Sequence, residues 1–278
     1  MTVRAAQRSL AVTRAQLFYG LFLIATLNGF VGLAARSIEG AGWAAAAFDL
    51  FGISAILWAA LAAGLKILGE DDGTAPLRRG DVAIALVLLL AALLPIPPAS
   101  AVALTAASLW AALTAAPGSP LRRAAIVFLA ITGAILWGRL LLAGLSRPLL
   151  DIDAVFVAGT LGVEHQGNMI WSADGANRII VAPGCSSMQG MSLAIVFWAT
   201  VNQLFRVGFG WKALSYCLAA LAATVAINVL RMGAMLRWPE HQAEIHHGWG
   251  MHVAMWTTLA AVVAICLFGA RREAFGPR

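Results

Sequence analysis

The sequence predicts an all-α polytopic membrane protein with about eight transmembrane helices and one small extracytoplasmic β-hairpin. Three observations support this fold class: the charge content, the apolar stretches and the placement of Lys and Arg. Of the 278 residues, 61% are hydrophobic and only 12% are charged, whereas a soluble domain usually carries about 25% charged residues. A soluble globular enzyme and a disordered chain are therefore excluded, because neither is built from so few charged side chains.

Eight apolar stretches approach the length of about 20 residues that a membrane span needs. They cover residues 17–35, 42–65, 82–94, 100–116, 124–145, 187–205, 213–238 and 251–270. The third and fourth stretches are short and meet at Pro95, Pro97 and Pro98. They form either a tight hairpin or a re-entrant element, and the second alternative leaves seven spans. The first stretch is too long, and is followed by too many others, to be a cleaved signal peptide.

The placement of Lys and Arg predicts that both termini lie in the cytoplasm, because cytoplasmic loops carry an excess of these residues. With eight spans and the N-terminus inside, the outer segments hold only Arg36, Arg147, Arg178 and Arg237. The inner segments hold the other Lys and Arg residues, apart from two inside spans. We interpret the net charge of +6 as basic cytoplasmic loops and expect no nucleic-acid partner.

The chain is predicted to be one integral membrane domain, residues 1–278, that lies in a lipid bilayer. It comprises N-terminal spans (1–145), an extracytoplasmic loop (146–184) and C-terminal spans with the candidate catalytic residues (185–278). Within the loop, residues 168–171 and 178–181 read as two short strands around a turn that contains Asp174 and Gly175. This pattern predicts a β-hairpin.

Three charged residues fall inside predicted spans, where charge is costly and marks functional positions. Asp49 lies just inside the second span and is most simply an interfacial or bundle-facing carboxylate. Arg139, in the fifth span, forms a structural salt bridge or extends to the membrane surface. Arg231 differs because Asn228 lies three residues before it, so both side chains project from one helical face.

Cys185 directly precedes the sixth span. Ser186 and Gln189 have the spacing of a capping box, which predicts a helix N-terminus here. The helix dipole and the free backbone amides at such an end favour a thiolate, the nucleophilic form of cysteine. Pro183 and Gly184 make a sharp approach that is expected to expose the sulfur.

The other two cysteines, Cys217 and Cys266, lie inside apolar runs and are expected to be small packing residues.

Four of the five histidines lie in the connection between the last two spans. They are His241, His246, His247 and His252. Imidazole spacing alone would allow a metal site, but no His-Glu-x-x-His motif is present, and we expect no metal and no cofactor. The topology places these histidines on the same side of the membrane as Cys185 and Arg231. A Cys nucleophile, a His base and an Arg for an oxyanion or carboxylate make an acyl-transfer set.

At these residues the sequence resembles the exosortase/archaeosortase family of membrane cysteine transpeptidases. The resembling stretches are Gly167-Asn-Met-Ile170, Val181-Ala-Pro-Gly-Cys185-Ser-Ser-Met-Gln-Gly190, Asn228-Val-Leu-Arg231-Met and His246-His-Gly-Trp-Gly250. Their order matches the Cys, Arg, His order of the family, and the resemblance covers roughly residues 145–270. One departure is Ser187, because many members have Gly two residues after the cysteine.

The resemblance implies that Cys185 is the nucleophile, Arg231 the essential arginine and His246 the base, with His247 as the alternative base. Asn228 and Ser186 would support the substrate or the oxyanion. The implied substrate is an exported membrane protein with a C-terminal sorting signal, which consists of a short motif, a transmembrane helix and a basic tail. Cleavage would pass through a thioacyl intermediate that a lipid or glycan amine, or water, resolves.

With the basic inner loops, the resemblance also implies a location in the bacterial inner membrane, with the site extracytoplasmic. Two other functions stay open at this point. The chain could be a transporter or channel whose path is lined by the three charges inside spans. It could also be a non-catalytic component of an exopolysaccharide export or assembly system that keeps the fold without the activity.

Overall fold

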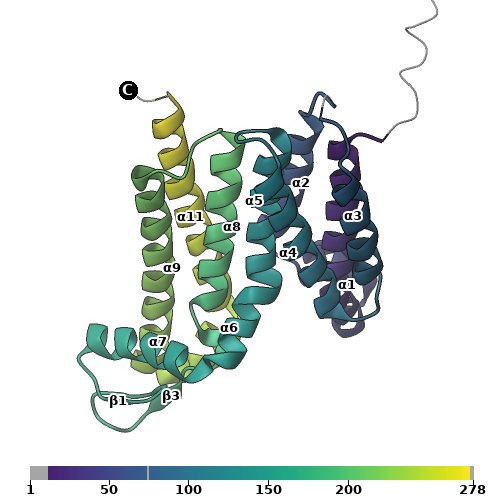
Figure 1. The fold of residues 1–278 in the computed structure, drawn as a ribbon. Coiled ribbons are helices and arrows are strands. Elements are labelled where there is room, and N and C mark those ends of the chain that lie inside the picture. The colour runs from purple at the N-terminus through teal and green to yellow at the C-terminus, as the bar shows by residue number, and fades with distance from the viewer. Residues whose placement is uncertain (1–11, 74, 276–278) are drawn as a thin grey trace, which may run out of the picture. The chain divides into compact units, whose positions relative to one another are not determined.

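The computed structural model describes residues 12–73 and 75–275, which fold into helices and three short strands (Figure 1). The chain divides after Thr132 into two compact units. The prediction of one integral membrane domain stays a prediction.

In the described part of the first unit the chain forms six helical segments. They are α1 (Arg14–Phe48), η1 (Leu50–Gly52), α2 (Ala55–Gly69), α3 (Arg79–Ala92), α4 (Pro97–Thr114) and α5 (Pro120–Thr132). Helix α1 begins with a capping box, in which the Thr13 side chain and the Gln16 side chain each accept the other residue's backbone N–H. Helix α4 packs against α1, α3 and α5, and α2 packs against α5.

The helices do not follow the bounds of the first two predicted stretches. Helix α1 runs through residues 36–41, is interrupted at Gly42 with φ 78°, and ends only at Phe48. Leu50, Phe51 and Gly52 have positive φ, which ends the helix, and the Ser54 hydroxyl then caps α2. Asp49, predicted inside the second span, is instead the exposed residue that caps the C-terminus of α1.

A buried ion pair between Arg14 and Asp81 holds the first unit together, although both residues lie outside the predicted spans. Arg14 Nε lies 2.9 Å from Asp81 Oδ2, and the exposed fractions of the two residues are 3% and 0%. Trp110 donates its indole N–H to the other carboxylate oxygen at 2.9 Å. The pair therefore ties α1 to α3 and α4.

The second unit carries the candidate site. Its helical segments are η2 (Gly133–Trp137, π-helical), α6 (Gly138–Gly144), α7 (Ser146–Leu161), η3 (Pro183–Cys185), α8 (Met188–Leu204), α9 (Trp211–Arg237), η4 (Pro239–His241), α10 (Gln242–His247) and α11 (Trp249–Phe275). Helices α8, α9 and α11 run side by side, and α7 and the strands lie at one end of them (Figure 1).

The segment 146–161, predicted as part of a loop, is a helix. The buried residues of α7 follow the helical spacing of Leu150, Ala154, Val157 and Ala158, which is an apolar face of period 3.6. Gly162 in the left-handed conformation, with φ 66°, ends the helix.

The predicted hairpin is confirmed. Strand β2 (Met169–Trp171) pairs antiparallel with β3 (Arg178–Ile180), and Ile170 lies opposite Ile179. A third strand, β1 (His165–Gln166), adds to the other edge of β2 in the order β1-β2-β3. Both Ile170 and Ile179 are buried, so the sheet packs one face into the core of the second unit.

Within the described residues, four helical stretches are long and apolar enough to cross a membrane. They are Arg14–Phe48, Pro120–Gly144, Trp211–Arg237 and Trp249–Phe275. The chain is thus a mainly helical, membrane-like protein. Helix α3, with 14 residues, reaches about 21 Å, so a crossing of the ~30 Å bilayer core at this place would include residues beyond the ends of the helix.

Candidate active site

Cys185 lies in the turn η3, between strand β3 and helix α8. Asn168 holds the chain at the entry to this turn, because its backbone C=O accepts the Val181 N–H at 2.8 Å and its side-chain amide donates to the Val181 C=O at 2.9 Å. The expectation that Pro183 and Gly184 expose the sulfur is wrong. Cys185 is only 5% exposed, since it belongs to the hydrophobic core cluster that α7, the sheet, α9 and α10 build.

The side chain that meets the Cys185 sulfur is His246. Cys185 Sγ and His246 Nε2 lie 2.8 Å apart, although 61 residues separate them in the chain. This contact is within hydrogen-bond reach for a nucleophile and its base. Of the two histidines that the sequence left open as the base, the structure places His246 against the thiol.

Two glycines explain how the histidines come to this position. A Cβ on Gly248 would lie 2.8 Å from the Glu244 carbonyl oxygen, and a Cβ on Gly250 would lie 2.5 Å from the Ile245 Cα. Only glycine permits this approach of α11 to α10. The chain therefore passes from α10 into α11 at Gly248 and leaves His246 and His247 on the last turn of α10.

His247 contacts His246 and not the sulfur. His246 Nδ1 and His247 Nε2 lie 2.6 Å apart, and the two rings are nearly perpendicular, at 87°. His247 is exposed, and His246 is half-buried.

Helix α9 contributes Asn228 and Arg231 from one face, as the spacing predicts. Asn228 donates from its amide to the Cys185 carbonyl oxygen at 2.8 Å. The Nε of Arg231 is buried and has no hydrogen-bond partner among residues 12–73 and 75–275. The positive charge of the guanidinium acts electrostatically on His246, so Arg231 lies close enough to influence the cysteine–histidine pair.

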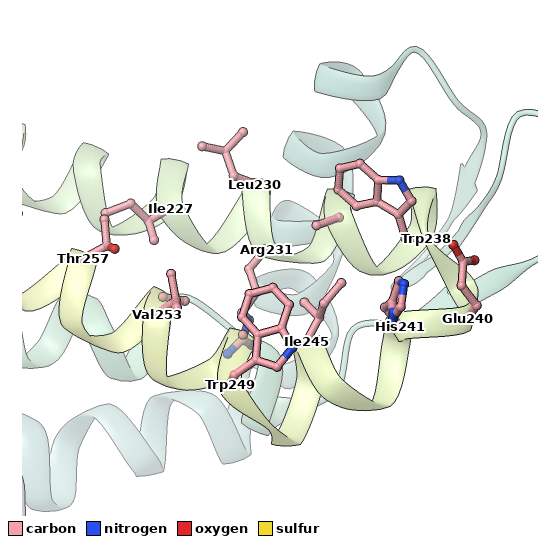
Figure 2. Close-up of a pocket in the computed structure, with 13 residues that line it drawn as sticks. Ile227, Leu230, Arg231, Trp238, Glu240, His241, Ile245, Trp249, Val253 and Thr257 are labelled. Carbon is pink, nitrogen blue, oxygen red and sulfur yellow. The ribbon is translucent and has the colours of Figure 1, made fainter.

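Arg231 lines a cavity of about 690 Å³ between α9, α10 and α11. Figure 2 shows Ile227 and Thr257 at one end and Trp238 with His241 at the other. Residues 227 to 237 of α9 rise by about 15 Å at 1.5 Å per residue. The Arg231 side chain extends from α9 toward the start of α11 (Figure 2).

The cavity adjoins the cysteine–histidine pair through one residue. Ile245 lines the cavity, packs in the core cluster of Cys185 and directly precedes His246.

Helix α8 begins close to the predicted position, but without the predicted capping box. The Ser186 N–H is bonded to the Pro183 C=O, so it is not free for Gln189. The Ser186 hydroxyl accepts the Met188 N–H at 3.2 Å. Ser186, predicted to support the oxyanion, therefore serves the start of the helix.

Sequence reasoning did not assign a role to Asp153, which fixes the turn that carries Cys185. Its carboxylate accepts the Ser187 hydroxyl at 2.6 Å and the Ser187 N–H at 3.2 Å. Asp153 is 3% exposed and Ser187 is 6% exposed. The Ser187 side chain bonds to α7 across 34 residues of sequence.

Burial lowers the pKa of His246 below its ordinary value of 6.5, and the charges of His247 and Arg231 lower it further. The neutral imidazole, which can accept a proton, is therefore favoured at neutral pH.

The remaining candidates lie away from this pair. Arg139 is an exposed residue of α6. His241 pairs with Glu244 at 3.1 Å, and His252 lies in the first turn of α11. Cys217 and Cys266 are buried in α9 and α11, which confirms them as packing residues.

No three His, Cys, Asp or Glu side chains of the described residues gather as metal ligands do.

No family model matches the chain, and no match was found among the curated proteins or the solved structures.

Proposed function

We propose that the protein is a membrane-embedded cysteine transpeptidase or protease that cleaves the C-terminal sorting signal of exported proteins. The observation that carries this proposal is the 2.8 Å contact between Cys185 Sγ and His246 Nε2. At this distance the imidazole can take the proton of the thiol, which activates the cysteine as a nucleophile at neutral pH. Arg231, whose Nε has no hydrogen-bond partner in the part of the chain that the structure describes, and the cavity beside the pair supply a cation and space for a substrate chain.

The proposed setting is a bacterial inner membrane, crossed eight times, with both termini in the cytoplasm. The distribution of Lys and Arg supports this orientation. It places the β-hairpin, Cys185 and His246 on the extracytoplasmic side. Exported proteins reach this face while their C-terminal helix is still in the bilayer, so the substrate and the pair meet there.

The first step is a proton transfer. His246 Nε2 takes the proton of the Cys185 thiol, and the resulting thiolate attacks the scissile carbonyl carbon. The carbonyl π electrons move to the oxygen, which becomes an oxyanion. When the tetrahedral intermediate collapses, the C–N bond breaks and His246 returns its proton to the leaving amine. The product is a thioester on Cys185.

Arg231 is the group that we assign to the developing negative charge. Its guanidinium has a buried Nε without a partner, and a preorganised donor of this kind acts strongly where water is excluded. Asn228 acts on the enzyme itself, because its amide is already bonded to the Cys185 carbonyl. It holds the backbone of the nucleophile, and this replaces the oxyanion support expected from the sequence.

The cavity between α9 and α11 receives an apolar part of the substrate next to the sorting motif. Its wall is formed mainly by apolar residues, with Arg231 beside them. An amine of a lipid or glycan, or water, then attacks the thioester carbonyl and frees Cys185, with His246 taking the proton from the attacking group.

The test is processing of a candidate substrate, produced in the same cells, that carries a short motif, a transmembrane helix and a basic tail. We expect Cys185→Ala, His246→Ala and Arg231→Ala to abolish the shift to the processed form on a blot, while membrane insertion stays intact. Cys217→Ala is the matched control, because Cys217 is a buried cysteine of α9. Processing by Cys185→Ala at the rate of the unchanged protein would refute the proposal.

A further inference from the structure

We infer that His247 is a positioning residue, which accepts a hydrogen bond from His246 Nδ1 and so holds His246 in the tautomer that can deprotonate Cys185. The inference rests on the proposed function, in which His246 is the base. It adds a third residue to the Cys185–His246 pair. His247 acts only through its contact with His246 and does not contact the reacting atoms.

The geometry shows two contacts in series. The Cys185 sulfur lies 2.8 Å from His246 Nε2, and on the opposite side of the same ring His246 Nδ1 lies 2.6 Å from His247 Nε2. Both contacts are within hydrogen-bond distance. Both nitrogens of the His246 ring are therefore engaged, each by one side chain.

A neutral imidazole carries its proton on one nitrogen only. If Nε2 of His246 is to accept the thiol proton, the ring proton must lie on Nδ1. That proton points at His247 Nε2, which must then be an acceptor and carry its own proton on Nδ1. In the opposite arrangement His247 donates, Nε2 of His246 holds a proton, and His246 cannot act as the base.

The same contact also supports the charged state. After proton transfer, the His246 imidazolium has an N–H on each nitrogen, one toward the thiolate and one toward His247. An acceptor at the second N–H favours the charged form. Burial and the charges of His247 and Arg231 lower the pKa of His246. A hydrogen bond accepted by a neutral His247 acts in the opposite direction and offsets part of this effect.

Other charged groups surround the pair on the elements packed against α10. They are Arg231 and Arg237 on α9, Glu240 and His241 on η4, Glu244 on α10 itself and His252 on α11. Glu244 is engaged with His241 at 3.1 Å. His247 is the side chain whose nitrogen meets His246 Nδ1, so it is the one that sets the tautomer.

The test compares two neutral replacements of similar size that differ in their ability to accept a hydrogen bond. The protein is purified with Cys217→Ala and Cys266→Ala, so that Cys185 is its only thiol, and the rate of Cys185 alkylation by iodoacetamide is measured at neutral pH. We expect His247→Met to slow alkylation on the order of 10-fold to 100-fold, by analogy with the loss of the hydrogen-bond partner of a metal-bound histidine. His247→Gln keeps an acceptor oxygen and should restore most of the rate.

Equal rates for the two replacements, whether both fast or both slow, overturn the inference, because only an acceptor role separates them. His252→Met is the matched control, as His252 is an exposed histidine of α11. Alkylation needs no protein substrate, and His246→Gln in the same background tests the pair itself. An unchanged rate in His246→Gln contradicts the proposed function. If His246→Gln slows Cys185 alkylation but the two His247 variants react at equal rates, only the role of His247 is contradicted.

Discussion

The Ser187 hydroxyl donates a 2.6 Å hydrogen bond to the Asp153 carboxylate, and both residues are buried. The contact joins helix α7 to the residue that follows Cys185 by two positions. A buried carboxylate is stable only when its oxygens are hydrogen-bonded. Asp153 accepts the Ser187 hydroxyl on one oxygen and the Ser187 N–H on the other. The buried carboxylate of α7 is therefore stabilised by the turn that carries Cys185, and the same two hydrogen bonds hold that turn against α7.

We therefore expect Ser187→Ala to lower the free energy of unfolding by about 1–3 kcal/mol, because it leaves a buried charged acceptor without its hydroxyl partner. Asp153→Ala should cost a similar amount, and the double variant less than the sum of the two. Thermal unfolding in detergent measures the loss of stability, and the rate of Cys185 alkylation measures the effect on the turn that carries Cys185. The control is Asp151→Asn, on the same helix but only partly buried. Strict additivity would contradict the coupling.

The pH dependence of Cys185 reactivity should carry the signature of His246. Burial, His247 and Arg231 lower the pKa of His246 from 6.5, so the alkylation rate should fall on the acid side of this value, as the imidazole becomes protonated. Arg231→Gln removes a positive charge that disfavours the protonated form, and the acid limb should move to higher pH. Arg237→Gln, on the same helix, is the control. A limb that moves to lower pH in Arg231→Gln would be inconsistent with the charge effect.

The glycine at position 250 should be irreplaceable. A Cβ there would lie 2.5 Å from the Ile245 Cα, and backbone atoms do not yield as side-chain ends do. Gly250→Ala should therefore displace α10, with His246 on it, and slow Cys185 alkylation together with a loss of thermal stability. Gly159→Ala is the control, since a Cβ at that helical position meets nothing within 4 Å. Equal behaviour of the two variants would contradict the close approach.

Asn228 should act as a donor to the Cys185 carbonyl. Asn228→Leu removes a hydrogen bond worth about 1 kcal/mol, whereas Asn228→Asp places carboxylate oxygens against a carbonyl oxygen. Since the three side chains are similar in size, the order of stability and of Cys185 reactivity should be Asn, then Leu, then Asp. An Asp variant as stable as the unchanged protein would show that the 2.8 Å contact does not hold the turn.

The sequence predicted those parts of the second unit whose signals are local. The hairpin could be predicted because Asp174 and Gly175 mark the turn between two β-prone segments. The common face of Asn228 and Arg231 follows from helical spacing alone. The approach of Cys185 and His246 was predicted only as a shared side of the membrane, and the structure narrows it to a 2.8 Å contact.

Two features of the fold, helix α7 and the end of helix α1, were not predicted correctly, and each has a physical cause. Helix α7 was taken for a loop because Asp151 and Asp153 interrupt its apolar face, and the burial of Asp153 depends on Ser187, 34 residues away. The first apolar stretch was ended at residue 35, whereas α1 continues with an interruption at Gly42 and ends only before the positive φ angles of residues 50–52. In both cases tertiary contacts or backbone conformation outweigh local composition.

The most direct test of the central claim is to trap the acyl group on the nucleophile. The protein is isolated from cells that also produce a candidate substrate, and the intact mass is measured before and after treatment with hydroxylamine, which cleaves thioesters. We predict an adduct that maps to Cys185, is released by hydroxylamine, persists in Cys217→Ala and is missing in Cys185→Ala. A substrate that is processed with no adduct on Cys185, or with an adduct on another residue, would contradict the account.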